Sequence, residues 1–90
     1  MANSNLYPVS ASKKTLKLPI LGQGSDGSAV RVLQQLLNFK GYTLEVDGQF
    51  GSLTEQAVKE FQLAHDLTVD GLVDGKTWHK LSLGILPSTF

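Results

Sequence analysis

The sequence predicts a small all-α domain, in which three helices close into one compact unit. Two observations lead to this prediction. The stretch Asp47–Gln62 joins a turn to an amphipathic helix, and its opening recurs over residues 70–78 with a shift of 23 residues. Two units of turn plus helix are too few for an open solenoid, which needs about three repeats. A closed domain built from a repeated Asp-Gly turn and helix is therefore expected.

The two turns are predicted from their Asp-Gly pairs, Asp47-Gly48 and Asp70-Gly71. An Asp side chain can accept a hydrogen bond from the backbone just after it, and Gly tolerates positive φ because it has no Cβ. Helix starts are expected directly after each turn. Ser52 and Glu55 are spaced as a capping box, and Asp74 is placed as the N-cap of the last helix.

The first and central helix is predicted over residues 28–40, with Ser25 or Asp26 as its cap and Gly41 ending it. Its apolar arc covers nearly half the circumference, which predicts neighbours on more than one side. That arc comprises Val30, Val32, Leu33, Leu36, Leu37 and Phe39. The other helices are predicted over 53–66 and 75–83, and residues 42–46 alternate like a short strand or extended loop.

Length and composition are those of one globular domain: 90 residues, 41% hydrophobic and 18% charged. Residues 1–17 are predicted to be a flexible tail or linker, 18–83 the domain and 84–90 a C-terminal tail. From residue 18 onward five cations face eight anions, which disfavours nucleic acid as a partner. No stretch is long and apolar enough to span a membrane, and no secretory signal is recognised.

Several fixed spacings together resemble the peptidoglycan-binding domain of the three-helix type. They are G-x-x-G-x-x-V-x-x-L-Q from Gly24, Gly-Tyr at Gly41, and the two Asp-Gly motifs with their following Thr and apolar positions. The resemblance runs from about Leu21 to Leu81. Two departures fall at helix starts, where this chain has Asp74-Gly75 and Gly51-Ser52-Leu53 in place of the usual Gly-Pro.

The resemblance implies a non-catalytic module, found attached to bacterial cell-wall hydrolases, that binds the glycan or stem peptide of peptidoglycan. It also implies an extracytoplasmic location, a linked or associated hydrolase, a monomer and no cofactor. The alternative is a protein-interaction or propeptide-like helper domain on the same fold. A propeptide that blocks a metalloprotease through a cysteine is disfavoured, because the chain has no cysteine.

The candidate ligand-binding residues each have a structural alternative. Tyr42 can stack on a sugar at a groove rim or pack at the edge of the core. Turn formation alone explains the two Asp-Gly pairs without a ligand. Gln34 and Gln62 either face sugar or satisfy buried loop backbone. The full set of candidates is Gln34, Tyr42, Asp47, Gly48, Gln62, Asp70 and Gly71.

Catalytic and metal sites are not supported by the sequence. No G-x-S-x-G elbow or cysteine nucleophile is present, and a domain of this size offers little room for a deep cleft. His65 and His79 lack the paired spacing of a zinc site such as H-E-x-x-H. The chain is therefore predicted to be neither an enzyme nor a metal-binding protein.

Overall fold

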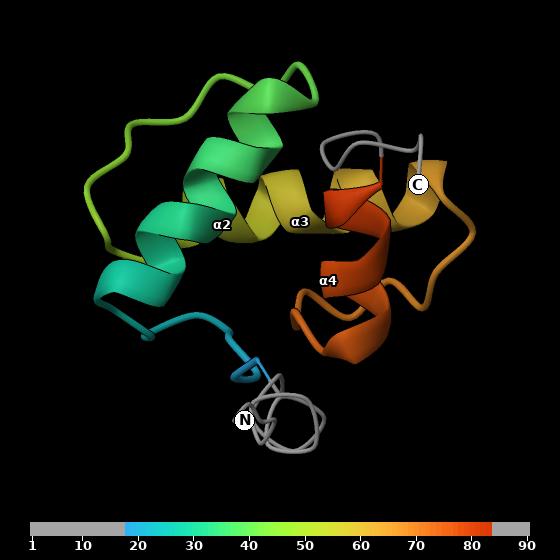
Figure 1. The fold of residues 1–90 in the computed structure, drawn as a ribbon, viewed down its shortest axis with the longest axis horizontal. Coiled ribbons are helices and arrows are strands. Elements are labelled where there is room, and N and C mark those ends of the chain that lie inside the picture. The colour runs from blue at the N-terminus through green and yellow to red at the C-terminus, as the bar shows by residue number, and fades with distance from the viewer. Residues whose placement is uncertain (1–17, 84–90) are drawn as a thin grey trace, which may run out of the picture.

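The computed structural model describes residues 18–83 and contains three helices in that range. They are α2 (Ser28–Phe39), α3 (Ser52–Ala64) and α4 (Gly75–Ser82). In Figure 1, α3 crosses behind α2 and α4, which lie beside each other. The all-α, three-helix prediction is confirmed, and each helix lies within two residues of its predicted bounds. The predicted tails at 1–17 and 84–90 fall outside the described residues.

The hydrophobic core lies where the three helices meet. Each helix contributes its apolar face, on which residues recur every 3.6 positions. The segments outside the helices add Leu21, Phe50 and Val73. The buried apolar residues are Leu21, Val30, Leu33, Leu37, Phe50, Ala57, Val58, Phe61, Val73, Trp78 and Leu81. The arc predicted for α2 is too wide, because Val32 and Phe39 are 47% and 67% exposed.

The segment before α2 links both turns of the chain. Leu21 pairs with Val73 and Asp26 with Gln49, each as an isolated antiparallel bridge. The indole Nε1 of Trp78 also donates to the carbonyl of Pro19, at 2.8 Å. Residues 42–46 form no strand and run as the extended loop that was the other expectation.

Two predicted helix caps are wrong. Gly27 is the N-cap of α2 at φ 108°, without a side-chain cap, and Asp26 instead pairs its backbone with Gln49. Gly51 is the N-cap of α3, again without a side-chain cap, so Ser52 lies inside the helix. The cap of α2 thus lies at least one residue later than predicted, and the cap of α3 lies one residue earlier. Asp74 does cap α4, accepting from Thr77 N at 3.2 Å.

Gly48 and Gly71 have positive φ, 78° and 75°, as the turn chemistry predicts. Space is also limited at Gly71, where a Cβ would lie 3.1 Å from Lys59 Cε and 3.2 Å from two atoms of Glu55. Gly71→Ala is therefore expected to lower the free energy of unfolding by at least about 1 kcal/mol.

Urea unfolding followed by circular dichroism measures this effect, with Gly75→Ala as the matched control. Gly75 begins α4, and a Cβ there would meet no atom within 4 Å. The control should change stability by less than about 0.5 kcal/mol or stabilise the domain. Equal losses in both variants would contradict the argument from backbone conformation.

Candidate functional site

The first Asp-Gly turn is held by the side chain of Gln34, which is 1% exposed. Gln34 Nε2 lies 3.0 Å from Asp47 Oδ1, 3.0 Å from Gln49 O and 3.1 Å from Thr54 Oγ1. Its Oε1 accepts from Gly48 N at 3.0 Å. One amide from α2 thus fixes the turn and the first helical turn of α3.

The second turn is held in the same way by Gln62 of α3, also 1% exposed. Gln62 Nε2 lies 3.1 Å from Asp70 Oδ1, 2.8 Å from Leu72 O and 3.2 Å from Thr77 Oγ1. Its Oε1 accepts from the backbone amides of Asp70 and Gly71, at 3.1 and 3.0 Å. The same set of partner types therefore joins each turn to the helix that follows it.

The polar atoms of both glutamines are engaged inside the domain. Buried amide groups without partners are costly, so these contacts account for Gln34 and Gln62 without any ligand. The two turns lie toward opposite ends of α3, since Thr54 and Gln62 are about 12 Å apart along a helix. The candidate residues are thus not gathered into one site.

Two connected hollows lie between the 42–51 loop and α3. One of about 310 Å³ lies beside the first turn, and one of about 220 Å³ lies beside Tyr42. They share Thr43, Leu44 and Leu53, so they form one groove, called here the polar groove. Among the described candidates, its lining includes Gln34, Tyr42 and Asp47 but not Gly48, Gln62, Asp70 or Gly71.

The loop side of the polar groove is held in place by Asn38 of α2. Asn38 Nδ2 donates to Leu44 O at 2.8 Å, and Leu44 N donates to Asn38 Oδ1 at 2.7 Å. This reciprocal pair fixes the 42–46 loop without a strand. The groove therefore has one wall set by α2 and one set by α3.

The polar groove has an acidic character. Glu45, Asp47 and Glu60 line it, and no Lys or Arg of the described residues does. Hydrogen bonds from Gln49 N and then the Gln34 side chain hold the pKa of Asp47 below its ordinary value. Burial, and then the Glu60 carboxylate, raise the pKa of Tyr42. The phenol therefore stays neutral and the carboxylate charged at neutral pH.

The groove residues that sequence reasoning did not single out as candidates include Glu45, Leu53 and Glu60. Leu53 is 73% exposed at the start of α3, although it is a large apolar side chain. The sequence did contain a signal for the exposure of Leu53, because Leu53 lies off the buried stripe of α3 that contains Val58 and Phe61. For the two glutamates, which lie on a loop and on the exposed side of a helix, the sequence gives no comparable signal.

Comparison with known proteins places this architecture in a family. Residues 26–81, more than half of the chain, match the family described as "Putative peptidoglycan binding domain". The chain belongs to this family. The family assignment agrees with the resemblance that the sequence motifs indicated.

The domain is also similar to parts of larger proteins. It is 42% identical over 66 residues to a zinc D-Ala-D-Ala carboxypeptidase of Streptomyces albus G, covering 68% of this chain and 25% of that protein. It is 42% identical over 59 residues to a spore cortex-lytic enzyme of Bacillus cereus, covering 64% of this chain and 23% of that enzyme. The chain thus matches about a quarter of each enzyme.

Two solved structures show the same fold. The N-terminal domain of SleB superposes with a TM-score of 0.68 at 41% identity, covering 70% of this chain and 88% of that chain. The Burkholderia AP3 phage endolysin gives a TM-score of 0.72 at 40% identity, covering 74% of this chain and 26% of that chain.

Two further observations concern the described residues only. Residues 18–83 contain no group of three or more His, Cys, Asp or Glu side chains placed to hold a metal ion. Of the helices in that range, none has the length and apolar character needed to cross a membrane.

The peptidoglycan-binding domain should depend strongly on its buried amides. Gln34→Leu leaves the amide of Gly48 and the carbonyl of Gln49 without their partner, and is expected to cost about 2–4 kcal/mol of unfolding free energy. Gln35→Leu, next to it on the exposed side of α2, should change stability by less than about 0.5 kcal/mol. Denaturant unfolding of both variants measures the difference, and a similar small effect in both would contradict the role of Gln34.

The lowered pKa of Asp47 gives a pH dependence with a definite sign. Because the folded-state pKa lies below the ordinary 3.8, the ionised carboxylate stabilises the fold above that pH, and the contribution is lost as pH falls through the folded pKa. An NMR titration of the Asp47 carboxyl carbon should show a midpoint below 3.8.

The stability difference between wild type and Asp47→Asn should accordingly be larger at pH 7 than below pH 3. A titration midpoint at or above 3.8, or a stability difference that is independent of pH, would contradict the prediction.

Proposed function

We propose that this domain is a non-catalytic module that binds bacterial peptidoglycan and holds a linked or associated cell-wall enzyme near its substrate. The observation that carries this proposal is the family match over residues 26–81. The named relatives support it, because they include a D-Ala-D-Ala carboxypeptidase and a spore cortex-lytic enzyme in which this unit is one part of a longer chain. The corresponding location is extracytoplasmic, where peptidoglycan lies.

The proposed binding surface is the polar groove. It is shallow, and it combines hydrogen-bond acceptors with one phenol and an exposed leucine, which suits a hydroxyl- and amide-rich polymer. Tyr42 and Leu53 would provide apolar contact with a sugar ring, and Asp47 and Glu60 would accept hydrogen bonds from hydroxyl or amide groups. Asp70 and Gly71 are assigned to the second turn and not to this surface.

The acidic lining also bears on which part of peptidoglycan is bound. Three carboxylates without a lining cation repel the carboxylates of a stem peptide and favour neutral or amine-bearing groups. The glycan strand is therefore the proposed ligand. Individually weak contacts suffice, because a polymer presents many equivalent sites and tethering raises the effective concentration of an attached enzyme.

A matched pair of exposed leucines on α3 tests the surface. Leu53 and Leu63 are 73% and 71% exposed, but only Leu53 lines the polar groove. Leu53→Ser is expected to reduce co-sedimentation with purified peptidoglycan at least about five-fold, through lost apolar contact. Leu63→Ser should bind like the wild type.

An amide-shift titration with soluble muropeptides identifies the residues that respond. Shifts concentrated at residues 42–60 would support the polar groove. Shifts elsewhere would place the ligand on another surface, and no co-sedimentation by the wild type would overturn the proposed function itself.

A further inference from the structure

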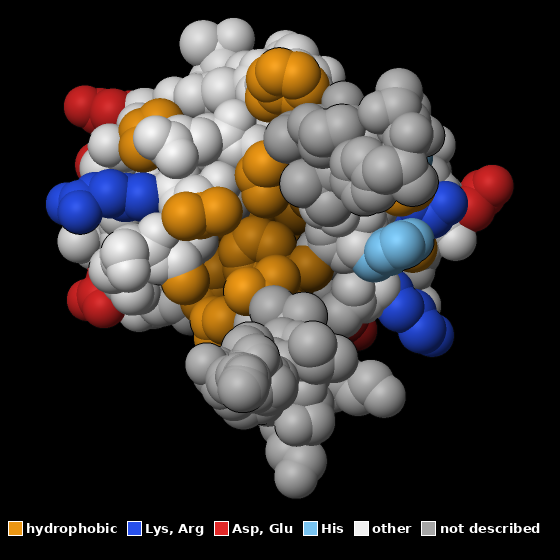
Figure 2. Space-filling view, in the orientation of Figure 1, with side chains coloured by type: hydrophobic (Ala, Val, Ile, Leu, Met, Phe, Trp, Pro, Cys, Tyr) orange, Lys and Arg blue, Asp and Glu red, His pale blue; other side chains and the backbone are white. Residues whose placement is uncertain are grey.

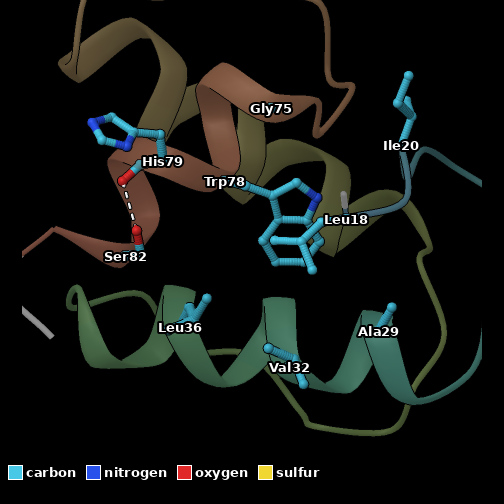
Figure 3. Close-up of a pocket in the computed structure, with 9 residues that line it drawn as sticks. All are labelled: Leu18, Ile20, Ala29, Val32, Leu36, Gly75, Trp78, His79 and Ser82. Carbon is cyan, nitrogen blue, oxygen red and sulfur yellow. Dashed lines mark hydrogen bonds between the residues drawn. The ribbon is translucent and has the colours of Figure 1, made fainter. Parts of the chain in front are cut away.

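Two grooves flank α2, and the larger one lies between α2 and α4. Its volume is about 680 Å³, and Figure 3 shows Val32 and Leu36 on one side with the Trp78 indole opposite them. Figure 2 shows hydrophobic side chains gathered in a central depression on this face. This surface is called here the apolar groove. No Lys, Arg, Asp or Glu of residues 18–83 lines it, so recognition of charge is expected on the other side of α2.

Arg31 lies on that other side of α2, close to Gln34. The two residues are three positions apart, so they are neighbours on one face of the helix. Arg31 is exposed, and its stem covers the buried Gly48. A Cβ at Gly48 would lie 3.4 Å from Arg31 Cγ and 3.3 Å from Arg31 Nε. The guanidinium group is therefore held at the first turn, next to Asp47, which lines the polar groove.

The backbone also fixes the position of Arg31 relative to this turn. Gly27 N donates to Gly48 O at 2.9 Å, and Gly27 O accepts from Arg31 N at 3.2 Å. Gly27 thus joins the start of α2 directly to the Asp-Gly turn. A side chain positioned in this way loses less conformational entropy on binding a ligand than a freely moving one.

Within residues 18–83, no carboxylate lies close enough to Arg31 to form an ion pair. Asp47 Oδ1 instead accepts from Gln34 Nε2 and Gln49 N. These hydrogen bonds, that from Gln49 first, lower the pKa of Asp47 most, and the more distant Arg31 charge lowers it further. Arg31 is thus near the polar groove without being neutralised by it.

The other cations of residues 18–83 lie elsewhere. Lys40 donates to the chain at the end of α4, and Lys59 forms an ion pair within α3. Lys76 and Lys80 belong to α4 itself. Arg31 is therefore the cation positioned at the first turn.

We propose that Arg31 binds a carboxylate that projects from a glycan strand lying in the polar groove, and so places the peptide-bearing side of the strand at the first turn. This inference rests on the proposed function. In peptidoglycan such carboxylates belong to the lactyl group of every second sugar or to the stem peptide attached there. A planar guanidinium can bind a carboxylate through two parallel hydrogen bonds.

The acidic lining of the polar groove supports this arrangement. Glu45, Asp47 and Glu60 repel a carboxylate from the groove itself. The neutral part of the strand would then lie between the 42–51 loop and α3, and its anionic substituent would point out toward Arg31. The two surfaces together would distinguish peptidoglycan from an uncharged polymer of amino sugars.

Two soluble probes test the contact by NMR titration: a peptide-bearing muropeptide and a neutral N-acetylglucosamine oligomer. Arg31→Gln should weaken binding of the muropeptide about three- to five-fold, because charge-assisted hydrogen bonds are lost at an exposed site. It should change binding of the uncharged oligomer by less than about two-fold. Lys76→Gln removes the same charge from an exposed position on α4 and should bind both probes like the wild type.

A muropeptide from which an amidase has removed the peptide identifies the carboxylate, since it retains the lactyl carboxylate alone. Weaker binding of this probe by Arg31→Gln would assign the contact to the lactyl group. A loss confined to the intact muropeptide would assign it to the stem peptide. Either result supports the contact.

Arg31→Met separates the charge from the packing, because it keeps an apolar stem over Gly48. It should lose as much muropeptide affinity as Arg31→Gln, and added salt should weaken muropeptide binding more in the wild type than in either variant. Wild-type affinity in both variants, or an equal loss for the muropeptide and the oligomer, would overturn the inference and leave the proposed function standing. Failure of the wild type to bind either probe would overturn the proposed function and the inference with it.

Discussion

The fold depends on two buried glutamine side chains. Each one is hydrogen-bonded to the Asp and the Gly of one turn and to a Thr of the helix that follows that turn. A glutamine amide has two donor hydrogens and one acceptor oxygen with two lone pairs, so one side chain can satisfy several backbone and side-chain groups at once. Gln34 joins the first turn to α3, and Gln62 joins the second turn to α4. No buried polar side-chain atom of the described residues lacks a partner. The short loops can therefore pass close to the core without leaving unpaired amides there.

The helices were predictable because their apolar residues repeat at helical spacing. Asp74 was also predictable as a cap, since it precedes Thr77 by three residues and local chemistry decides that contact. The caps of α2 and α3 were not, because long-range backbone pairing at Asp26 and the unusual φ of Gly27 determine how the chain enters α2. A local pattern contains neither of these constraints.

The candidate site was only partly predictable for a related reason. The sequence shows that Gln34 and Gln62 lie at the edges of apolar arcs, but their hydrogen-bond partners are separated from them by 8 to 20 residues along the chain. The polar groove depends on how the 42–51 loop lies against α3, which the turn motifs do not specify. The sequence places Leu53 off the buried stripe of α3, but only the packed structure brings it beside the 42–51 loop.

The two grooves use different sides of α2. Gln34, which lines the polar groove, is about 200° around the helix from Val32, which lines the apolar one. The core stripe of Val30, Leu33 and Leu37 separates them. One short helix thus supports a polar surface and an apolar surface without exposing the core between them.

The segment from Pro19 to Gly27 also determines how the domain carries mechanical load. It is hydrogen-bonded to the Trp78 indole, to the Val73 backbone and to the backbone of Gly48 and Phe50, so it connects parts of the chain that are far apart in sequence. A pull on the chain at Leu18 acts first on the Pro19 and Leu21 hydrogen bonds, before any helix is stretched. Force on that end would therefore detach the entry segment from α4 and the second turn while α3 keeps its own backbone hydrogen bonds.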